Sequence, residues 1–107
     1  MESILLTIKK LIGIDENYEH FDVDIITSIN TALNILNQIG VGQEDGFYIK
    51  GTDEKWKDFI GDDIKIEMVK TYIYLKCKKI FDPPTSSSLL KAIDEQIAEL
   101  EWRLSVK

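Results

Sequence analysis

The chain contains one histidine and one cysteine, His20 and Cys77, which are the side chains most suited to nucleophilic catalysis. A cysteine nucleophile needs a neighbouring base and a third group that orients the base. His20 lies in an acidic stretch, whereas Cys77 lies within a helical pattern of apolar residues, so the two would have to meet across the fold. The simpler interpretation is that both are structural. A lone cysteine, which cannot form an internal disulfide, is typical of a reducing compartment such as the cytoplasm.

Carboxylates are the other groups that could do chemistry. Several gather between Asp15 and Asp24, and such hard oxygen ligands can hold a divalent cation. The stretch lacks the central Gly and terminal Glu of a calcium loop, and Asp22 is placed to cap a following helix. No Gly-rich phosphate loop, Ser-His-Asp arrangement or zinc spacing is present in the sequence. We therefore predict no catalytic site, no metal site and no cofactor. The remaining paired acids are expected on the solvated side of the last helix: Asp94, Glu95, Glu99 and Glu101.

Composition narrows the classes of partner. The 107 residues include 13 Lys and Arg against 19 Asp and Glu, which gives a formal net charge of −6. This excess of acid disfavours binding to nucleic-acid phosphates and to anionic lipid. No apolar stretch is long enough to cross a bilayer. An apolar fraction of 44% with only two Pro and six Gly is typical of one folded domain, which we expect over residues 1–107.

The periodicity of apolar residues predicts an all-α fold, a small bundle of four or five helices. The Asp82-Pro83-Pro84 connection is short, so the last two helices should form an antiparallel hairpin. Residues 41–51 contain three glycines and should form a Gly-rich loop or a short hairpin. Thr52 or Asp53 should cap the short helix that follows. The expected helices cover residues 3–12, about 23–39, a short segment containing Trp56, Phe59 and Ile60, about 62 or 63 to 80, and about 89–104.

Three surfaces are not explained by folding alone. The second expected helix carries no charge between Asp24 and Glu44, and depletion of charge marks the core of an interface. The alternative is that this helix lies in the middle of the bundle, covered on both sides. A Gly-flanked aromatic loop and an apolar C-terminus supply the other two surfaces, because aromatic residues there are either core lids or anchors for a partner. The candidate interface residues are Asn30, Thr31, Asn34 and Asn37; Phe47, Tyr48 and Ile49; and Trp102, Leu104 and Val106.

The lysines of the fourth expected helix form a locally basic stretch in an acidic chain. Their long stems can lie along the apolar face while their charges balance the acidic last helix. The functional alternative is a contact with the acidic face of a neighbouring subunit. These residues are Lys65, Lys70, Lys76, Lys78 and Lys79.

The order of segments resembles the small head-to-tail connector, or adaptor, proteins of tailed bacteriophages and prophages. The likeness covers nearly the whole chain, and it rests on packing and capping residues. They are Leu11-Ile12-Gly13-Ile14, Phe21-Asp22, Leu36-Asn37-Gln38-Ile39-Gly40-Val41-Gly42, the run from Val69 to Lys76, Ile80-Phe81-Asp82-Pro83-Pro84, and Glu99-Leu100-Glu101-Trp102-Arg103-Leu104.

The resemblance implies a structural protein that is not an enzyme. Such a protein would be made in the bacterial host cytoplasm and would form a homo-oligomeric ring at the virion head-tail junction. Its partners would be the portal protein above it and a tail-side completion protein below it. DNA would pass through its channel without sequence-specific binding, which agrees with the net acidic charge. The rival hypothesis is a small acidic regulatory binding module, inhibitor or antitoxin-like, that uses the same acidic faces.

Overall fold

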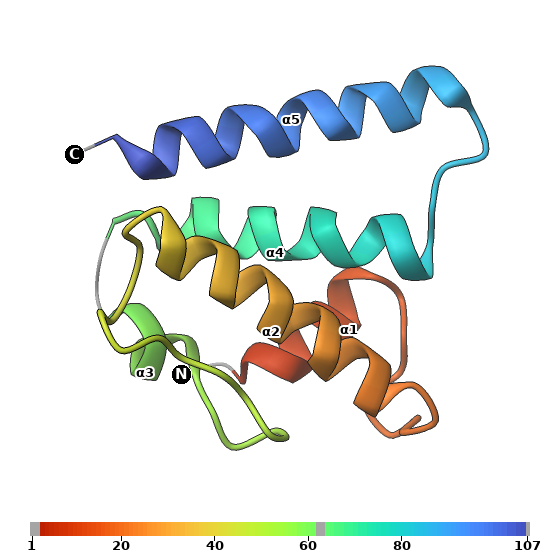
Figure 1. Cartoon of the computed structure of the whole chain (residues 1–107). Coiled ribbons are helices and arrows are strands. Elements are labelled where there is room, and N and C mark those ends of the chain that lie inside the picture. Colours follow the sequence, from red (N-terminus) through yellow and green to blue (C-terminus); the bar gives the residue numbers. More distant parts are fainter. Residues whose placement is uncertain (1–2, 62–63, 107) are drawn as a thin grey trace.

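The computed structural model describes residues 3–61 and 64–106, and this part of the chain is helical with no strand (Figure 1). The all-α prediction is confirmed. An isolated backbone bridge between Ser3 and Lys55 ties the first helix to the loop before the third. The elements are α1 (Ile4–Leu11), α2 (Asp22–Gln38), α3 (Trp56–Ile60), α4 (Ile66–Phe81) and α5 (Ser87–Ser105).

Serine caps begin the first and last helices. The Ser3 hydroxyl accepts a hydrogen bond from the Leu6 amide at 3.3 Å, and α1 ends before Gly13, whose φ is +86°. The Ser86 hydroxyl accepts from the Leu89 amide, also at 3.3 Å. Each hydroxyl satisfies one of the amides that a helix start leaves without an intrahelical partner.

Two expected caps are wrong. Asp22 is the first residue of α2 rather than its cap, because its carboxylate pairs with the Lys9 ammonium at 2.8 Å. The cap of α3 is Lys55 rather than Thr52 or Asp53, and its amide donates to the Asp58 carboxylate at 3.0 Å. The expected start of the fourth helix, residues 62 or 63, lies outside the described residues.

Helix α4 is central in the bundle. Helices α1 and α2 pack on one side of α4, and α5 turns back to lie antiparallel along another side (Figure 1). Apolar residues of all five helices meet in one core, which includes the fully buried Trp56, Tyr72 and Ile73. The molecule is flat, with extents of 36 × 32 × 19 Å, so it is about two helix diameters thick. In the described part of the chain, no helix is both long and apolar enough to cross a membrane.

Candidate assembly surfaces

The loop between α2 and α3 is held against α2 by the Asn30 side chain. Its amide nitrogen donates to the Ile49 carbonyl at 3.0 Å, and its amide oxygen accepts from the Ile49 amide at 2.7 Å. The Asn30 side chain thereby binds both the backbone carbonyl and the backbone amide of Ile49, as a paired strand would do. Ile49 is only 1% exposed, so its backbone groups depend on Asn30 rather than on water.

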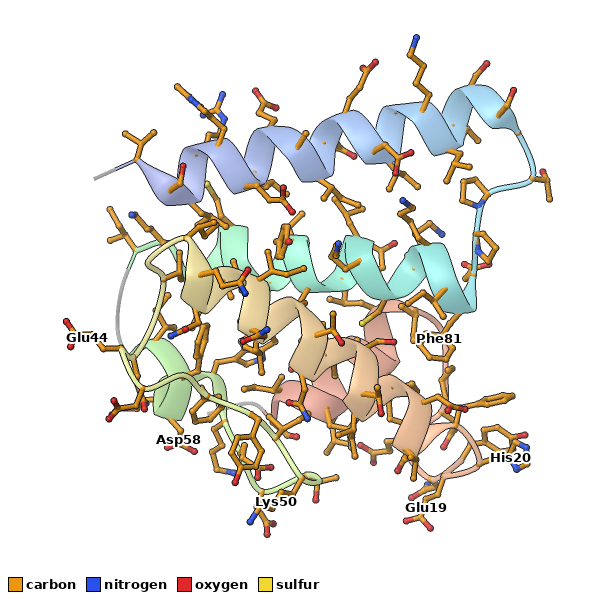
Figure 2. All side chains as sticks on the ribbon, viewed as in Figure 1. Glu19, His20, Glu44, Lys50, Asp58 and Phe81 are labelled. Atoms are coloured by element: carbon orange, nitrogen blue, oxygen red, sulfur yellow. The ribbon has the colours of Figure 1, made fainter. Side chains whose placement is uncertain are left out.

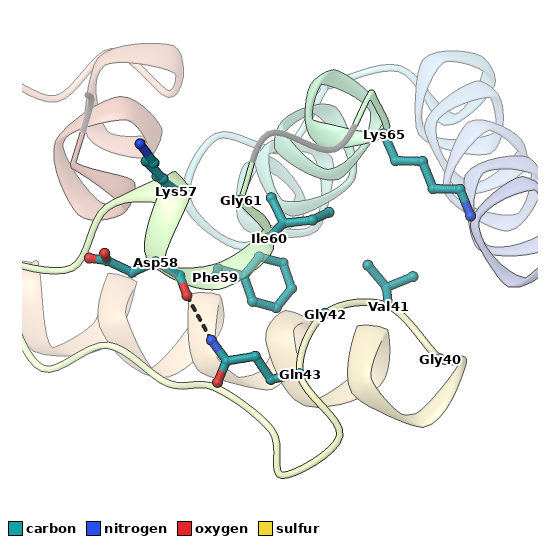
Figure 3. A pocket seen from close by; sticks show the side chains of 10 residues that line it. All are labelled: Gly40, Val41, Gly42, Gln43, Lys57, Asp58, Phe59, Ile60, Gly61 and Lys65. Carbon is teal, nitrogen blue, oxygen red and sulfur yellow. Dashed lines mark hydrogen bonds between the residues drawn. The ribbon is translucent and has the colours of Figure 1, made fainter.

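A second clamp holds the beginning of the same loop. The Asn37 amide nitrogen donates to the carbonyls of Gln43 at 2.7 Å and Glu44 at 3.3 Å. The side-chain amide nitrogen of Gln43 donates in turn to the Asp58 backbone carbonyl at 2.7 Å (Figure 3). Gly42 has a φ of +85°, and a Cβ atom there would lie 2.5 Å from the Phe59 ring. Two of the uncharged residues of α2 therefore serve the fold itself.

The rest of the uncharged face of α2 is open. Thr27 and Thr31 are exposed, and their hydroxyls donate to the carbonyls four residues earlier, at 2.9 and 3.0 Å. These backbone bonds leave the hydroxyls little need of water. We call this exposed face the α2 strip, and it consists of Val23, Thr27, Thr31, Asn34 and Gln38.

A groove separates the α2 strip from α4. It holds about 410 Å³, and its α4 side carries two lysines and an isoleucine that is 62% exposed. The Lys76 ammonium lies 6.0 Å from the centre of the Tyr72 ring, and the Lys79 ammonium pairs with the Asp94 carboxylate at 2.5 Å. The α2–α4 groove is therefore basic and partly apolar, in a chain of net charge −6. Its lining residues are Thr27, Ser28, Thr31, Lys76, Lys79 and Ile80.

The three aromatic-loop candidates lie in different surroundings. Ile49 is buried, and the half-buried Phe47 ring lies 5.5 Å from the Phe59 ring, centre to centre. Tyr48 is 62% exposed, with the Lys50 ammonium 5.7 Å from its ring. In this conformation only Tyr48 presents its ring fully to a partner.

The C-terminal candidates also divide. Leu104 is buried, whereas Trp102 is 67% exposed and Val106 is 50% exposed. The Val106 carbonyl accepts a hydrogen bond from the Lys65 ammonium at 3.4 Å, so the end of α5 lies beside the start of α4. The structure thus leaves Thr31, Asn34, Tyr48, Trp102 and Val106 as the predicted residues that are open to a partner.

The residues suited to catalysis do not form a site. His20 lies in the exposed loop before α2 (Figure 2), where its ring is 4.9 Å from that of Phe21 and 6.0 Å from that of Tyr18. Cys77 is fully buried in α4, and burial raises the pKa of its thiol to about 12. The thiol is therefore protonated at neutral pH and inaccessible. Within residues 3–61 and 64–106, no three His, Cys, Asp or Glu side chains are grouped so that they could hold a metal ion.

Sequence reasoning missed the ion pair between Lys9 and Asp22. Lys9 is 1% exposed and Asp22 is 21% exposed, and they join α1 to α2. Lys9 falls at the edge of the apolar stripe of its helix, but nothing in the sequence pattern matches it to an acid in the next helix.

A family model described as phage connector protein matches residues 4–107. Neither the curated proteins nor the solved structures contain a significant match.

Proposed function

The chain belongs to the phage connector protein family, and from this premise we propose that it is a head-to-tail connector subunit that forms a ring under the portal. Family membership gives the chain a structural connector role in a phage, in assembly with other head or tail proteins. It favours this role over an acidic regulatory module and over an enzyme. The ring, the portal as partner and the place at the head-tail junction are the finer parts of the proposal.

The α2 strip is the observation that supports ring formation. Between Thr27 and Gln38 its exposed residues extend over about three turns of α2 without one charged group, although 30% of the chain is charged. Amide and hydroxyl groups are less costly to remove from water than full charges. A face without charge is what a protein interface needs at its centre.

Exposed apolar side chains at both ends of the α4–α5 pair support contacts with a portal on one side and a tail component on the other. At one end, Ile64 is 95% exposed and Val106 is 50% exposed. At the other end, Leu89 and Leu90 are 58% and 36% exposed. Such side chains near both ends of a small domain are suited to two separate partners.

The net charge of −6 supports a channel through which DNA passes. Affinity for DNA comes mainly from lysines and arginines that displace counterions from phosphates. An acidic ring would repel the phosphates and leave DNA free to move.

The test mixes the purified protein with its portal and examines the complex by electron microscopy. The parent is expected to form a ring on the portal, whereas Asn34→Lys, which puts a charge in the α2 strip, should stay unassembled while keeping its helical circular dichroism. Asn17→Lys is the matched control, since Asn17 is exposed in the loop before α2. Failure of the parent to bind any portal or tail component would overturn the connector role. Normal assembly of Asn34→Lys would show that the strip is only solvated.

A further inference from the structure

The outer face of α5 has no partner within its own subunit. Helix α5 packs on α4 through a seam that includes Ile93, Ile97 and Leu104. Trp102 follows Ile93 by nine residues, and at about 100° per residue this rotation places it on the side opposite the seam. Trp102 is 67% exposed. Tryptophan contributes more than most residues to binding energy at interfaces.

The residues around Trp102 on this outer face are small or charged, and the adjacent Arg103 pairs with the Glu99 carboxylate at 3.2 Å. Ala98 lies four residues before Trp102, and Glu99 and Glu95 lie three and seven residues before it. These spacings place all four side chains in one row along the helix. We call this row the α5 outer face. It presents a large aromatic anchor beside the Glu95 carboxylate and the Glu99–Arg103 ion pair.

The α2–α4 groove has the complementary chemistry. Lys76 supplies positive charge, the Lys79 ammonium is already paired with Asp94 of the same subunit, Ile80 supplies an exposed apolar surface, and the α2 side supplies only hydroxyl groups. Carboxylates gain from neighbouring ammonium groups, and an ammonium group is attracted to the face of a tryptophan ring. Binding of a helix in a groove is a recurring mode of protein recognition.

We propose that the α5 outer face of one subunit docks in the α2–α4 groove of the next subunit. The inference rests on the proposed function, because it names the contact that builds the ring. The two surfaces differ, so each subunit uses one surface toward each neighbour. Contacts of this heterologous kind generate rings when the rotation between subunits closes.

Cysteine trapping tests the contact directly. Thr31 borders the groove and Ala98 lies in the outer face, and both are exposed. Thr31→Cys and Ala98→Cys proteins are mixed in equal amounts, assembled with portal and oxidised. We expect covalent dimers on a non-reducing gel, at least tenfold more abundant than with the control mixture. The parent serves as a blank, because its single cysteine, Cys77, is buried.

The control mixture pairs Ala98→Cys with Thr71→Cys. Thr71 is matched to Thr31: it is exposed within a helix, and its hydroxyl donates to the carbonyl four residues earlier at 3.0 Å, but it lies on α4 away from the groove. Equal trapping by both mixtures, or no trapping in rings visible by electron microscopy, would overturn the contact and leave the connector role standing. Protection of Ala98→Cys from maleimide by portal alone, without a ring, would assign the α5 outer face to the portal and also overturn the contact. Absence of any ring would overturn the ring proposal on which this inference rests, whereas failure to bind any portal or tail component would overturn the connector role.

Discussion

Lys9 is the one charged side chain that is buried in the described part of the chain. Its ammonium group contacts the Asp22 carboxylate at 2.8 Å and donates to the carbonyls of Glu16 at 3.1 Å and Tyr18 at 2.8 Å. These three acceptors match the three donors of an ammonium group. The loop between α1 and α2 therefore closes around a satisfied charge, and Asp22, one of the clustered acids, is used in this ion pair.

Replacing Lys9 with methionine should lower the free energy of unfolding by about 3 kcal/mol, because it leaves the Asp22 carboxylate and two carbonyls without their donor. Lys10→Met is the control, since the neighbouring Lys10 is exposed, and it should change stability by less than about 0.5 kcal/mol. Urea denaturation followed by circular dichroism measures both. Equal midpoints for the two variants would contradict the structural role of Lys9.

Cys77 should make stability depend on pH in the alkaline range. Burial raises the pKa of its thiol from 9.0 to about 12, so above pH 9 the unfolded chain loses this proton while the folded chain keeps it. The contribution is complete below pH 9 and is lost as pH rises from 9 to 12. Between pH 8 and 9.5 the parent should lose about 1 kcal/mol more unfolding free energy than Cys77→Ala. Parallel pH profiles from urea denaturation would contradict the shift. Both proteins retain Tyr72, whose pKa is also raised by burial, so the difference isolates the thiol.

At the scale of elements, apolar spacing was sufficient to predict where the helices lie. The segment predicted as about residues 23–39 is α2 at Asp22–Gln38, because its buried stripe of Ile25, Ile29, Leu33 and Leu36 repeats at helical intervals. Caps were less predictable. Asp22 has the right type for a cap, but a buried lysine from another helix takes its carboxylate. Such a pairing depends on tertiary structure and leaves no local pattern.

The same limit applies to the uncharged face of α2. The absence of charge is visible in the sequence, but the sequence does not show which of these residues bind the loop and which are exposed. Asn30 and Asn37 bind the loop, whereas Asn34 is exposed. The three asparagines are alike in type, and only the path of the loop separates them.

Asn30→Ala should lower the free energy of unfolding by about 2 kcal/mol, because the buried amide and carbonyl of Ile49 lose their partner. Asn34→Ala should change it by less than about 0.5 kcal/mol. Hydrogen exchange adds a local measure: the Ile49 amide should exchange faster in Asn30→Ala and at the parental rate in Asn34→Ala. Unchanged protection of Ile49 in both variants would contradict the clamp.

At the scale of the whole molecule, folding and assembly draw on different faces. The core is formed by α4 with α1, α2 and α3 on one side and the α5 seam on another, and it leaves both the α2 strip and the α5 outer face exposed. A flat subunit about two helix diameters thick exposes much of its surface on its broad sides. Residues of the same segment can therefore serve either the core or an assembly surface, and buried Leu104 and exposed Trp102 are the clearest example.

Trp102→Ala and Leu104→Ala should separate the contribution to subunit stability from the contribution to assembly. Leu104 is 2% exposed, so its truncation should cost about 2–5 kcal/mol of subunit stability. Trp102 is 67% exposed and faces away from the seam, so its truncation should leave the subunit within about 0.5 kcal/mol of the parent. Assembly should respond in the opposite sense, because Trp102→Ala removes the proposed anchor and should weaken subunit association at least tenfold, or about 1.4 kcal/mol. Urea denaturation of the dilute subunit measures the first effect, and mass measurement in solution with portal, across a concentration series of the subunit, measures the second. Parental assembly by Trp102→Ala would show that the ring does not use the outer face of α5.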